Sequence, residues 1–254
     1  MEVRGEKLAA LPTPRSAGLS RTTRTERCFD VLLVLVMLPA ITVVAAVIAL
    51  AIYIDSPGPV MYRSWRVGKD GELFAMLKFR KMRREAESHP VTLDEDDRFT
   101  PIGRCLAATR LDELPQIYNV LRGQMRLVGP RPELECFVVQ FSDEYREILS
   151  VTPGVTGNAQ LQFVDEKHLL GGPDPERVYR DHVLPAKIEI DLRYVRTHSV
   201  LGDLAILART LMLPPMLLIH RARAGSATLR VWIPTAATAV LLATAFVIAS
   251  SHFS

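Results

Sequence analysis

Three apolar stretches, separated by polar sequence, divide this chain of 254 residues. They run from Val31 to Ile54, from Leu204 to Ile219 and from Val231 to Ala249. A helix needs about 20 apolar residues to cross a ~30 Å hydrocarbon core. The first stretch meets that length and the third is close to the minimum. The pattern therefore predicts a membrane-associated protein whose polar part lies between the first two stretches.

The first stretch allows three interpretations. Ala49-Leu-Ala51 imitates a signal-peptide cleavage site, but the run greatly exceeds the roughly 7–15 apolar residues of a signal peptide. A plain transmembrane helix and a re-entrant helix, with both ends on the cytoplasmic side, are the other two. Basic residues flank both ends, so the positive-inside rule gives no orientation. Pro39 removes a helix hydrogen bond and predicts a kink. Hydropathy alone favours a plain span, whereas symmetric flanking charge would result from re-entrance.

The second stretch is short and interrupted. Arg209 lies inside it, and we expect Pro214-Pro215 to break any helix. An interfacial amphipathic segment over residues 203–223 is the preferred interpretation, and a core helix of the globular domain is the open alternative.

The third stretch contains no charged residue. Arg221, Arg223 and Arg230 precede it and no Lys or Arg follows it. That asymmetry predicts a transmembrane helix over 231–250 whose N-terminal end is cytoplasmic, reached through a polar linker at 224–230.

The polar region between the membrane segments, residues 55–202, has the length of one domain. Met61 to Val67 and Leu73 to Phe79 flank a Gly68-Lys-Asp-Gly71 turn and predict a small β-hairpin. Helical periodicity follows, and the segments that show it are 114–127, 135–149 and 187–195. The predicted fold class is α+β, mostly helical.

The composition limits the classes of molecule that the protein is expected to bind. The 31 Lys and Arg residues nearly balance 28 Asp and Glu, for a formal net charge of +3. That small surplus predicts no nucleic-acid partner. Basic residues are frequent in the leader, 1–28, which suits an anionic membrane surface, and a solvated leader is the alternative. The cysteines, Cys28, Cys105 and Cys136, lack metal-ligand spacing and are interpreted as reduced packing residues.

Two polar motifs carry the candidate chemistry. Asp112 and Glu113 open a predicted amphipathic helix, and Gly129-Pro-Arg-Pro132 fixes Arg131 on a stiff backbone. Carboxylates bind Mg²⁺, and an arginine fork binds phosphate oxygens. Together they indicate chemistry on a diphosphate. Taken alone, the acidic pair is more simply explained as a complement to a helix N-terminus.

The surrounding motifs decide between these interpretations. In chain order they are Ser56-Pro-Gly-Pro-Val-Met-Tyr-Arg63, Lys78-Phe-Arg-Lys-Met82, Leu111-Asp-Glu-Leu-Pro-Gln116, Val128-Gly-Pro-Arg-Pro132, Pro153-Gly-Val-Thr-Gly157 and Asp191-Leu-Arg-Tyr-Val195. From about Arg27 to Ile219 this series resembles the bacterial sugar transferase family, the monotopic phosphoglycosyl transferases that start polyprenol-linked glycan assembly. Each motif alone is weak evidence, but their order and spacing are specific.

The resemblance implies roles for the two motifs. Asp112 would be the nucleophile, Asp112 and Glu113 would form a Mg²⁺ site, and Arg131 would clamp the diphosphate. An aspartate carboxylate can attack phosphorus and form an acyl phosphate. The resemblance also favours the re-entrant geometry for residues 29–54.

Further substrate contacts follow from the same resemblance. Lys78 and Arg80 would steer the anionic donor or the prenyl phosphate. Gly154 and Thr156 lie in a turn whose backbone N–H groups would approach the nucleotide. Asp191 and Tyr194 are expected to be scaffold residues.

The chain departs from the family pattern in two places. Ala107 stands where many members have a basic residue, and Arg104 and Arg110 are the candidate replacements. We include Arg110 among the predicted substrate contacts. After Gly157 the sequence differs through Pro175, so residues that read the nucleotide or sugar are expected to differ too.

The function expected from sequence is transfer of a sugar-1-phosphate from a UDP-sugar to undecaprenyl phosphate, with release of UMP. The catalytic domain would lie on the cytoplasmic face of a bacterial inner membrane, in contact with membrane lipid. This would be the initiating step of exopolysaccharide, capsule, O-antigen or glycoprotein glycan assembly. Two alternatives are a catalytically idle membrane adaptor and a signal-peptide-bearing extracytoplasmic binding protein. The transferred sugar and the oligomeric state, including a homo-oligomer, stay open.

Overall fold

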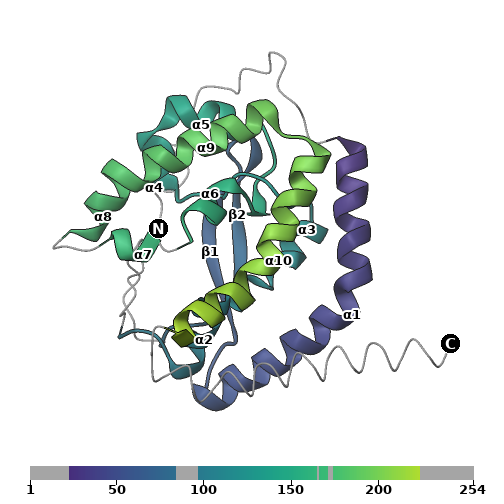
Figure 1. Ribbon diagram of the computed structural model, residues 1–254, viewed down its shortest axis with the longest axis vertical. Helices are drawn as coiled ribbons and strands as arrows, with labels where there is room; N and C mark the ends of the chain where they lie inside the picture. The colour runs from purple at the N-terminus through teal and green to yellow at the C-terminus, as the bar shows by residue number, and fades with distance from the viewer. Residues whose placement is uncertain (1–22, 84–96, 165, 171–173, 224–254) are drawn as a thin grey trace.

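The structure, a computed structural model, describes residues 23–83, 97–164, 166–170 and 174–223 (Figure 1). Side chains at 167, 168 and beyond 212 are not part of that description. Most of the predicted leader, the predicted linker 224–230 and the predicted transmembrane helix 231–250 lie outside the described residues. The rest is mostly helical with a small β-hairpin, which confirms the predicted balance of helix and strand.

The described elements follow one another along the chain in one series. They are α1 (Arg24–Asp55), β1 (Met61–Val67), η1 (Lys69–Gly71), β2 (Leu73–Phe79), α2 (Pro101–Thr109), η2 (Leu111–Glu113), α3 (Gln116–Leu121), β3 (Arg126–Val128), α4 (Glu135–Gln140), α5 (Ser142–Ile148), β4 (Gly154–Thr156), α6 (Asn158–Gln162), α7 (Glu166–Leu169), α8 (Pro175–Val178), η3 (Tyr179–Val183), α9 (Leu184–Thr197) and α10 (Val200–Arg223).

The predicted hairpin is present. β1 and β2 pair antiparallel, with Met61 opposite Phe79 and Val67 opposite Leu73. Asn119 on α3 completes the outer edge of β2, because its amide accepts from Leu77 N (3.0 Å) and donates to Ala75 O (2.9 Å). Helix α3 is thereby fixed beside the strand that carries Lys78.

A second, parallel pair replaces part of a predicted helix. The helix expected over 114–127 ends at Leu121, because Gly123 adopts a positive φ of 80° that reverses the chain. The chain then enters β3, which pairs with β4. Gly129 and Gly154 lie so close that a Cβ on Gly154 would come within 2.1 Å of Gly129 N.

The predicted helix over 135–149 is also divided. Phe141, with φ −112° and ψ 43°, separates α4 from α5. The helix predicted over 187–195 is confirmed within α9. Together α4, α5 and α9 enclose one apolar core, whose members include Phe137, Val138, Tyr145 and Ile188.

Helix α1 carries the first apolar stretch. It is the one helix in the described part of the chain that is long and apolar enough to cross a membrane, and only 11% of its most apolar window is buried. Figure 1 shows it as two limbs that meet at an angle, as expected for a helix with an internal proline, Pro39. Its C-terminal end packs through Ile48 and Ile52 against Phe79 and Leu106. The end of the membrane-type helix therefore lies beside the end of β2.

The N-terminal end of α1 is anchored by charge. Arg27 donates to the carbonyls of Val120 and Leu121 at the end of α3. Arg126 on β3 lies 3.1 Å from Asp30 Oδ2 and 3.6 Å from Glu26 Oε2. These contacts tie α1 to the domain at both ends.

Helix α10 corrects one part of the prediction for the second apolar stretch, the helix break at Pro214-Pro215, while its interfacial location stays a prediction. It begins at Val200 and continues through Pro214-Pro215 to Arg223, whereas we expected the prolines to break it. Proline's fixed φ is itself helical, so the helix continues although each proline removes a hydrogen bond. Its exposed side is an apolar stripe, made of Leu201, Leu204, Ala205, Ala208, Leu211 and Met212.

Two of the cysteines are not packing residues as predicted. Cys28 and Cys136 are exposed, Cys105 is half-buried, and all three are free thiols. Asp191 and Tyr194 are buried, as expected of scaffold residues.

Candidate active site

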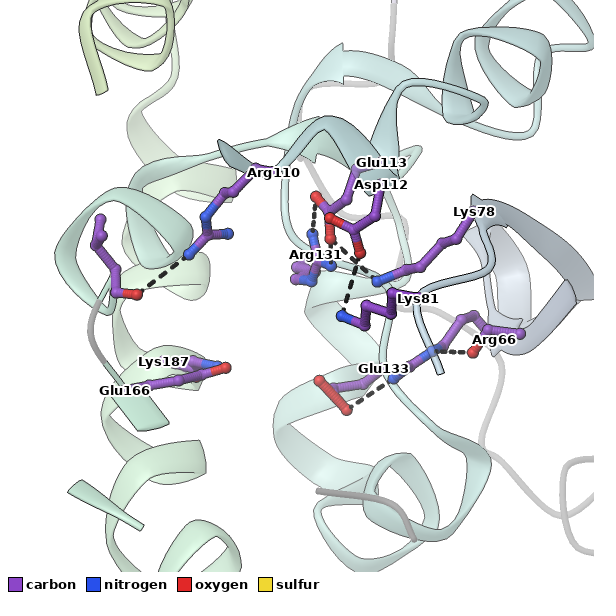
Figure 2. Close-up of polar contacts among 12 residues, drawn as sticks. Arg66, Lys78, Lys81, Arg110, Asp112, Glu113, Arg131, Glu133, Glu166 and Lys187 are labelled. Carbon is purple, nitrogen blue, oxygen red and sulfur yellow. Dashed lines mark hydrogen bonds and ion pairs between the residues drawn. The ribbon is translucent and has the colours of Figure 1, made fainter. Parts of the chain in front are cut away.

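The acidic pair lies on a tight turn between two helices, not on a regular helix. Arg110 ends α2 in the left-handed conformation, with φ 58°, which is uncommon for a non-glycine residue. The chain then forms the short 3₁₀ turn η2, which carries Asp112 and Glu113. This sharp change of direction brings both carboxylates toward the basic end of β2 (Figure 2).

Asp112 is buried, with 3% of its surface exposed. Lys81 Nζ lies 3.1 Å from Asp112 Oδ2 and forms an ion pair with it. The direction of approach is not that of a hydrogen bond, so Oδ2 is a buried oxygen without a hydrogen-bond donor among the described residues. An incompletely satisfied carboxylate oxygen is suited to accept a cation or to attack an electrophile.

Glu113 is held by two basic side chains. Arg131 donates through both terminal nitrogens, at 3.2 Å from Nη1 to Oε2 and through Nη2 to Oε1. Lys78 Nζ lies 3.0 Å from Oε1. Burial alone would raise the pKa of Glu113, but Arg131 and Lys78 outweigh it and hold that pKa well below its usual range. Glu113 is therefore ionised at neutral pH.

The two cations respond differently to the same burial. Burial lowers the pKa of Lys78 to about 8, although Glu113 opposes the shift. Burial also acts against the charge of Arg131, but Glu113 prevails and raises the Arg131 pKa above its ordinary value. Arg131 stays a permanent cation, whereas Lys78 titrates close to neutral pH.

The turn that carries Arg131 is fixed from behind by β4. Gly154 N donates to Pro130 O (2.8 Å), and Gly129 N donates to Thr156 O (2.9 Å). The Thr156 hydroxyl lies 2.7 Å from that of Thr210 on α10. Gly154 and Thr156 were predicted as substrate contacts, and that role stays a prediction. The contacts they make here position Arg131.

The other predicted residues are divided between two places. Arg80 is buried and donates to the carbonyl of Ser56 at the end of α1, so its guanidinium faces the membrane-type helix. Arg110 donates to Val164 O at 3.4 Å, and its charge contributes to the lowered pKa of Glu113. Arg104 and Arg110 were the two candidates to replace the basic residue missing at Ala107. Of these, Arg110 lies near the acidic pair of Asp112 and Glu113.

Sequence reasoning missed Lys81. It lies in the quoted motif Lys78-Phe-Arg-Lys-Met82, but no role was assigned to it. Since β2 ends at Phe79, Lys81 is beyond the strict alternation of the strand and is free to point toward Asp112.

The sequence analysis also missed a second group of paired polar side chains. Glu133 accepts from Tyr179 Oη (2.9 Å) and pairs with Arg66 Nη1 (3.4 Å). Lys187 on α9 pairs with Glu166 on α7. No recognisable spacing links these residues, because they come from elements far apart in the sequence.

The donor set suits Mg²⁺. Asp112 supplies the buried Oδ2, which pairs with Lys81 but accepts no hydrogen bond from the described residues, and Glu113 supplies an adjacent carboxylate. Within the described residues no group of three or more His, Cys, Asp and Glu side chains could hold a metal ion. Mg²⁺ bound at this pair would therefore need phosphate oxygens and water as further ligands, which is its usual behaviour at substrate phosphates.

Comparison with known proteins gives a consistent family. Residues 21–214 match the family model described as "Bacterial sugar transferase". A relative from Aeromonas hydrophila, named UDP-N-acetylgalactosamine-undecaprenyl-phosphate N-acetylgalactosaminephosphotransferase, is 36% identical over 208 residues, which is 79% of this chain and 44% of the relative. A relative from Caulobacter vibrioides, named UDP-glucose:undecaprenyl-phosphate glucose-1-phosphate transferase, is 36% identical over 204 residues, covering 78% of this chain and 71% of the relative.

A third relative is matched over nearly all of its length. The exopolysaccharide production protein PSS of Rhizobium leguminosarum bv. phaseoli is 34% identical over 200 residues, covering 74% of this chain and 93% of the relative. The match to the Aeromonas protein, by contrast, spans less than half of that relative. The family match covers most of the chain and includes every motif of the candidate site, so the chain belongs to the bacterial sugar transferase family.

Proposed function

We propose that this protein transfers a sugar-1-phosphate from a UDP-sugar to undecaprenyl phosphate and releases UMP. The observation that carries the proposal is the buried Asp112 carboxylate beside an ionised Glu113, which Arg131 and Lys78 hold. Relatives named as undecaprenyl-phosphate sugar transferases support the same reaction class. The alternative of an idle adaptor has no support among those names.

The first chemical step is an attack by an Asp112 oxygen on the β-phosphorus of the donor. A bond forms between that oxygen and phosphorus, and the bond from phosphorus to the bridging oxygen breaks. UMP leaves with the bridging oxygen and its electron pair. The sugar phosphate stays on Asp112 as an acyl phosphate. Burial of Asp112 keeps water from hydrolysing this species.

The second step returns the enzyme to its starting state. A phosphate oxygen of undecaprenyl phosphate attacks the same phosphorus, and the bond to Asp112 breaks. The product is a polyprenyl diphosphate sugar, and the aspartate is again a carboxylate. The two half-reactions predict ping-pong kinetics.

Arg131 and Lys78 have a double role in this scheme. Without donor they neutralise Glu113, and with donor their N–H groups bind the diphosphate oxygens. Glu113 is then free to join Asp112 in a Mg²⁺ site, and the bound ion would neutralise charge on the diphosphate. The exchange of partners avoids leaving a buried charge unpaired at either stage.

The apolar surfaces support the proposal that a lipid acceptor reaches the site from the bilayer. Helix α1 and the exposed stripe of α10 both present apolar side chains, which suits contact with the bilayer. We propose that α1 is re-entrant at the cytoplasmic face of the bacterial inner membrane, with the kink at Pro39 inside the lipid. Single cysteines at Ser16 and Ser88, in a cysteine-free background, would then both resist a membrane-impermeant reagent in intact cells. Labelling of only one would mean a true span.

The reaction itself is tested by mixing purified protein with UDP-sugars, undecaprenyl phosphate and Mg²⁺ and measuring UMP. Denaturing mass spectrometry after incubation with donor alone should give a sugar-phosphate adduct on Asp112. UMP release without any adduct would point to direct transfer in one step. No UMP from any UDP-sugar would refute the proposed function.

A further inference from the structure

We propose that Glu166 and Lys187, with the rings of Phe163 and Tyr179, form the surface that recognises the sugar of the donor. This inference rests on the proposed function and adds the residues that choose among UDP-sugars. The four residues are called the sugar-reading wall below.

The sugar-reading wall lies opposite the basic end of β2. Figure 2 shows the Lys187–Glu166 pair on the same side of the Arg131–Glu113 contact as Arg110, with Lys78 and Lys81 on the other side. Glu166 is near enough to Arg131 to help raise the pKa of that guanidinium. The wall thus borders the residue that we assign to the diphosphate, on the side away from Lys81.

The wall is built around one ammonium group. The Lys187 side chain is 12% exposed and pairs with Glu166, which is 31% exposed. Its Nζ lies 5.0 Å from the ring centre of Tyr179 and 5.8 Å from that of Phe163. An ammonium between two rings and a carboxylate is held in one place, which a recognition surface requires.

The chemistry of the wall fits a sugar better than a phosphate. Glu166 cancels the charge of Lys187, so the pair offers no net attraction to an anion. It does offer a fixed acceptor and a fixed donor, which match neighbouring hydroxyl groups. The half-buried Phe163 ring beside them can cover the apolar face of a pyranose ring, whereas the buried Tyr179 ring holds Lys187 in place.

Covalent connectivity places the sugar here. The sugar is joined through one oxygen to the β-phosphorus that Asp112 attacks, so it lies immediately beside Arg131 when the diphosphate is clamped. The uridine is joined to the other phosphate and lies further away. A wall next to Arg131 is therefore within reach of the sugar hydroxyls.

The relatives show that sugar choice varies in this family. Two relatives with the same identity to this chain, 36%, are named for N-acetylgalactosamine and for glucose. Overall identity therefore does not determine the sugar, and individual side chains around it must do so.

The test compares Glu166→Gln and Lys187→Met with a matched pair on the same helix. Glu189 and Arg193 on α9 form an exposed ion pair (3.3 Å), with side chains 76% and 74% exposed, so Glu189→Gln and Arg193→Met are the controls. UMP release is measured with UDP-glucose, UDP-galactose, UDP-N-acetylglucosamine and UDP-N-acetylgalactosamine. We expect the wall variants to change the ratio of kcat/KM between two of these donors by at least about tenfold, and the controls to leave every ratio unchanged.

Two results would overturn the inference. One is a loss of the same factor with all four donors, which means a general structural or electrostatic role. The other is an unchanged sugar preference with a changed preference between UDP-glucose and TDP-glucose, which means that the wall reads the nucleoside. The sharper variant is Glu166→Gln, because it keeps the size of the side chain. The outcome is distinct from failure of the proposed function, in which the unmodified protein releases no UMP from any donor.

Discussion

Two buried charge clusters in this protein have opposite balances. The catalytic cluster consists of Asp112, Glu113, Lys78, Lys81 and Arg131. The anchoring cluster consists of Glu26, Asp30, Asp203, Arg126 and His198. The first has more cations than carboxylates. The second has more carboxylates than permanent cations, since histidine is charged only when protonated.

The difference in charge balance distinguishes a cluster that can bind a ligand from a cluster that holds elements of the fold together. The second, anchoring cluster is called the joint below. A surplus of cations leaves the catalytic cluster able to receive an anion, and its pairs can exchange partners with a diphosphate. In the anchoring cluster Arg126 contacts three carboxylates at once, and Tyr194 Oη donates to Asp203 at 2.8 Å. That arrangement joins α1, β3, α9 and α10 and has no cation to spare. β3 leads directly into the turn of Arg131, so the joint also supports the site.

The largest expected effect is on the nucleophile. Asp112→Asn keeps the shape of the side chain but removes the charge that attacks phosphorus. We expect UMP release to fall by at least about 10⁴-fold, with the melting temperature in detergent nearly unchanged. Turnover close to that of the unmodified protein would mean that Asp112 is not the nucleophile.

The next test exchanges the two arginines for lysine. Arg131→Lys loses the fork that grips Glu113 and, as proposed, the diphosphate, so kcat/KM should fall about 10²–10³-fold with little change in stability. Arg126→Lys cannot reach three carboxylates, so the free energy of unfolding should fall by about 3 kcal/mol, while the folded fraction keeps its activity within a few fold.

Activity and thermal melting are measured on both variants. If the two clusters differ as described, Arg131→Lys loses mainly activity and Arg126→Lys loses mainly stability. Equal losses of activity and stability in both variants would contradict the distinction between site and joint.

Lys78 predicts a pH dependence of the catalytic cluster. Its pKa is about 8 in the folded protein, below its ordinary value because of burial. As the pH rises through about 8 the free enzyme loses this cation, so kcat/KM should decline. For stability the sign is opposite: between pH 8 and about 10.4 the unfolded chain binds the proton that the folded chain has lost, so the free energy of unfolding rises with pH.

Lys78→Arg is the control for the decline of kcat/KM at alkaline pH, because an arginine stays charged throughout the range. The decline above pH 8 should then disappear or move upward. An alkaline limb that is identical in Lys78→Arg would assign the titration to another group.

The sequence predicted the parts of this protein that depend on local pattern. Strand alternation gave the hairpin that carries Lys78, and motif order gave the acidic pair and Arg131. The sequence-based prediction was wrong where a backbone turn determines the local secondary structure. The periodicity of 114–127 hid the reversal at Gly123, so β3 and its pairing with β4 were missed. Local pattern also placed Asp112 and Glu113 on a helix, whereas the left-handed Arg110 puts them on a 3₁₀ turn.

Contacts between distant elements explain the remaining differences. Arg80 was predicted, with Lys78, to steer the anionic donor or the prenyl phosphate, and that role stays a prediction. Its contact with Ser56 was not foreseen, because it depends on the packing of the end of α1 against β2. Glu166 and Lys187 come together through the packing of α7 and α9. No sequence spacing predicts such a pair. The sequence therefore predicts the hairpin and the candidate acidic pair better than the contacts between elements that are distant in the chain.

The smallest expected effect is at the contact between α10 and the Arg131 turn. Thr210→Val keeps the shape of the side chain but removes the hydroxyl that lies 2.7 Å from the Thr156 hydroxyl. The same hydroxyl also donates to Ile206 O (2.8 Å) within α10, so the variant loses two hydrogen bonds. Loss of the one to Thr156 should lower the free energy of unfolding by about 1 kcal/mol. Because Thr156 O accepts from Gly129 N, a slight loosening should reach Arg131, and kcat/KM should fall less than about tenfold. The matched control is Thr197→Val, an exposed threonine whose hydroxyl bonds, among the described residues, to Arg193 O within its own helix (2.8 Å). If α10 positions the turn, Thr210→Val lowers both stability and kcat/KM while Thr197→Val changes neither. Equal behaviour of the two variants would separate α10 from the site and leave β4 alone as the support of Arg131.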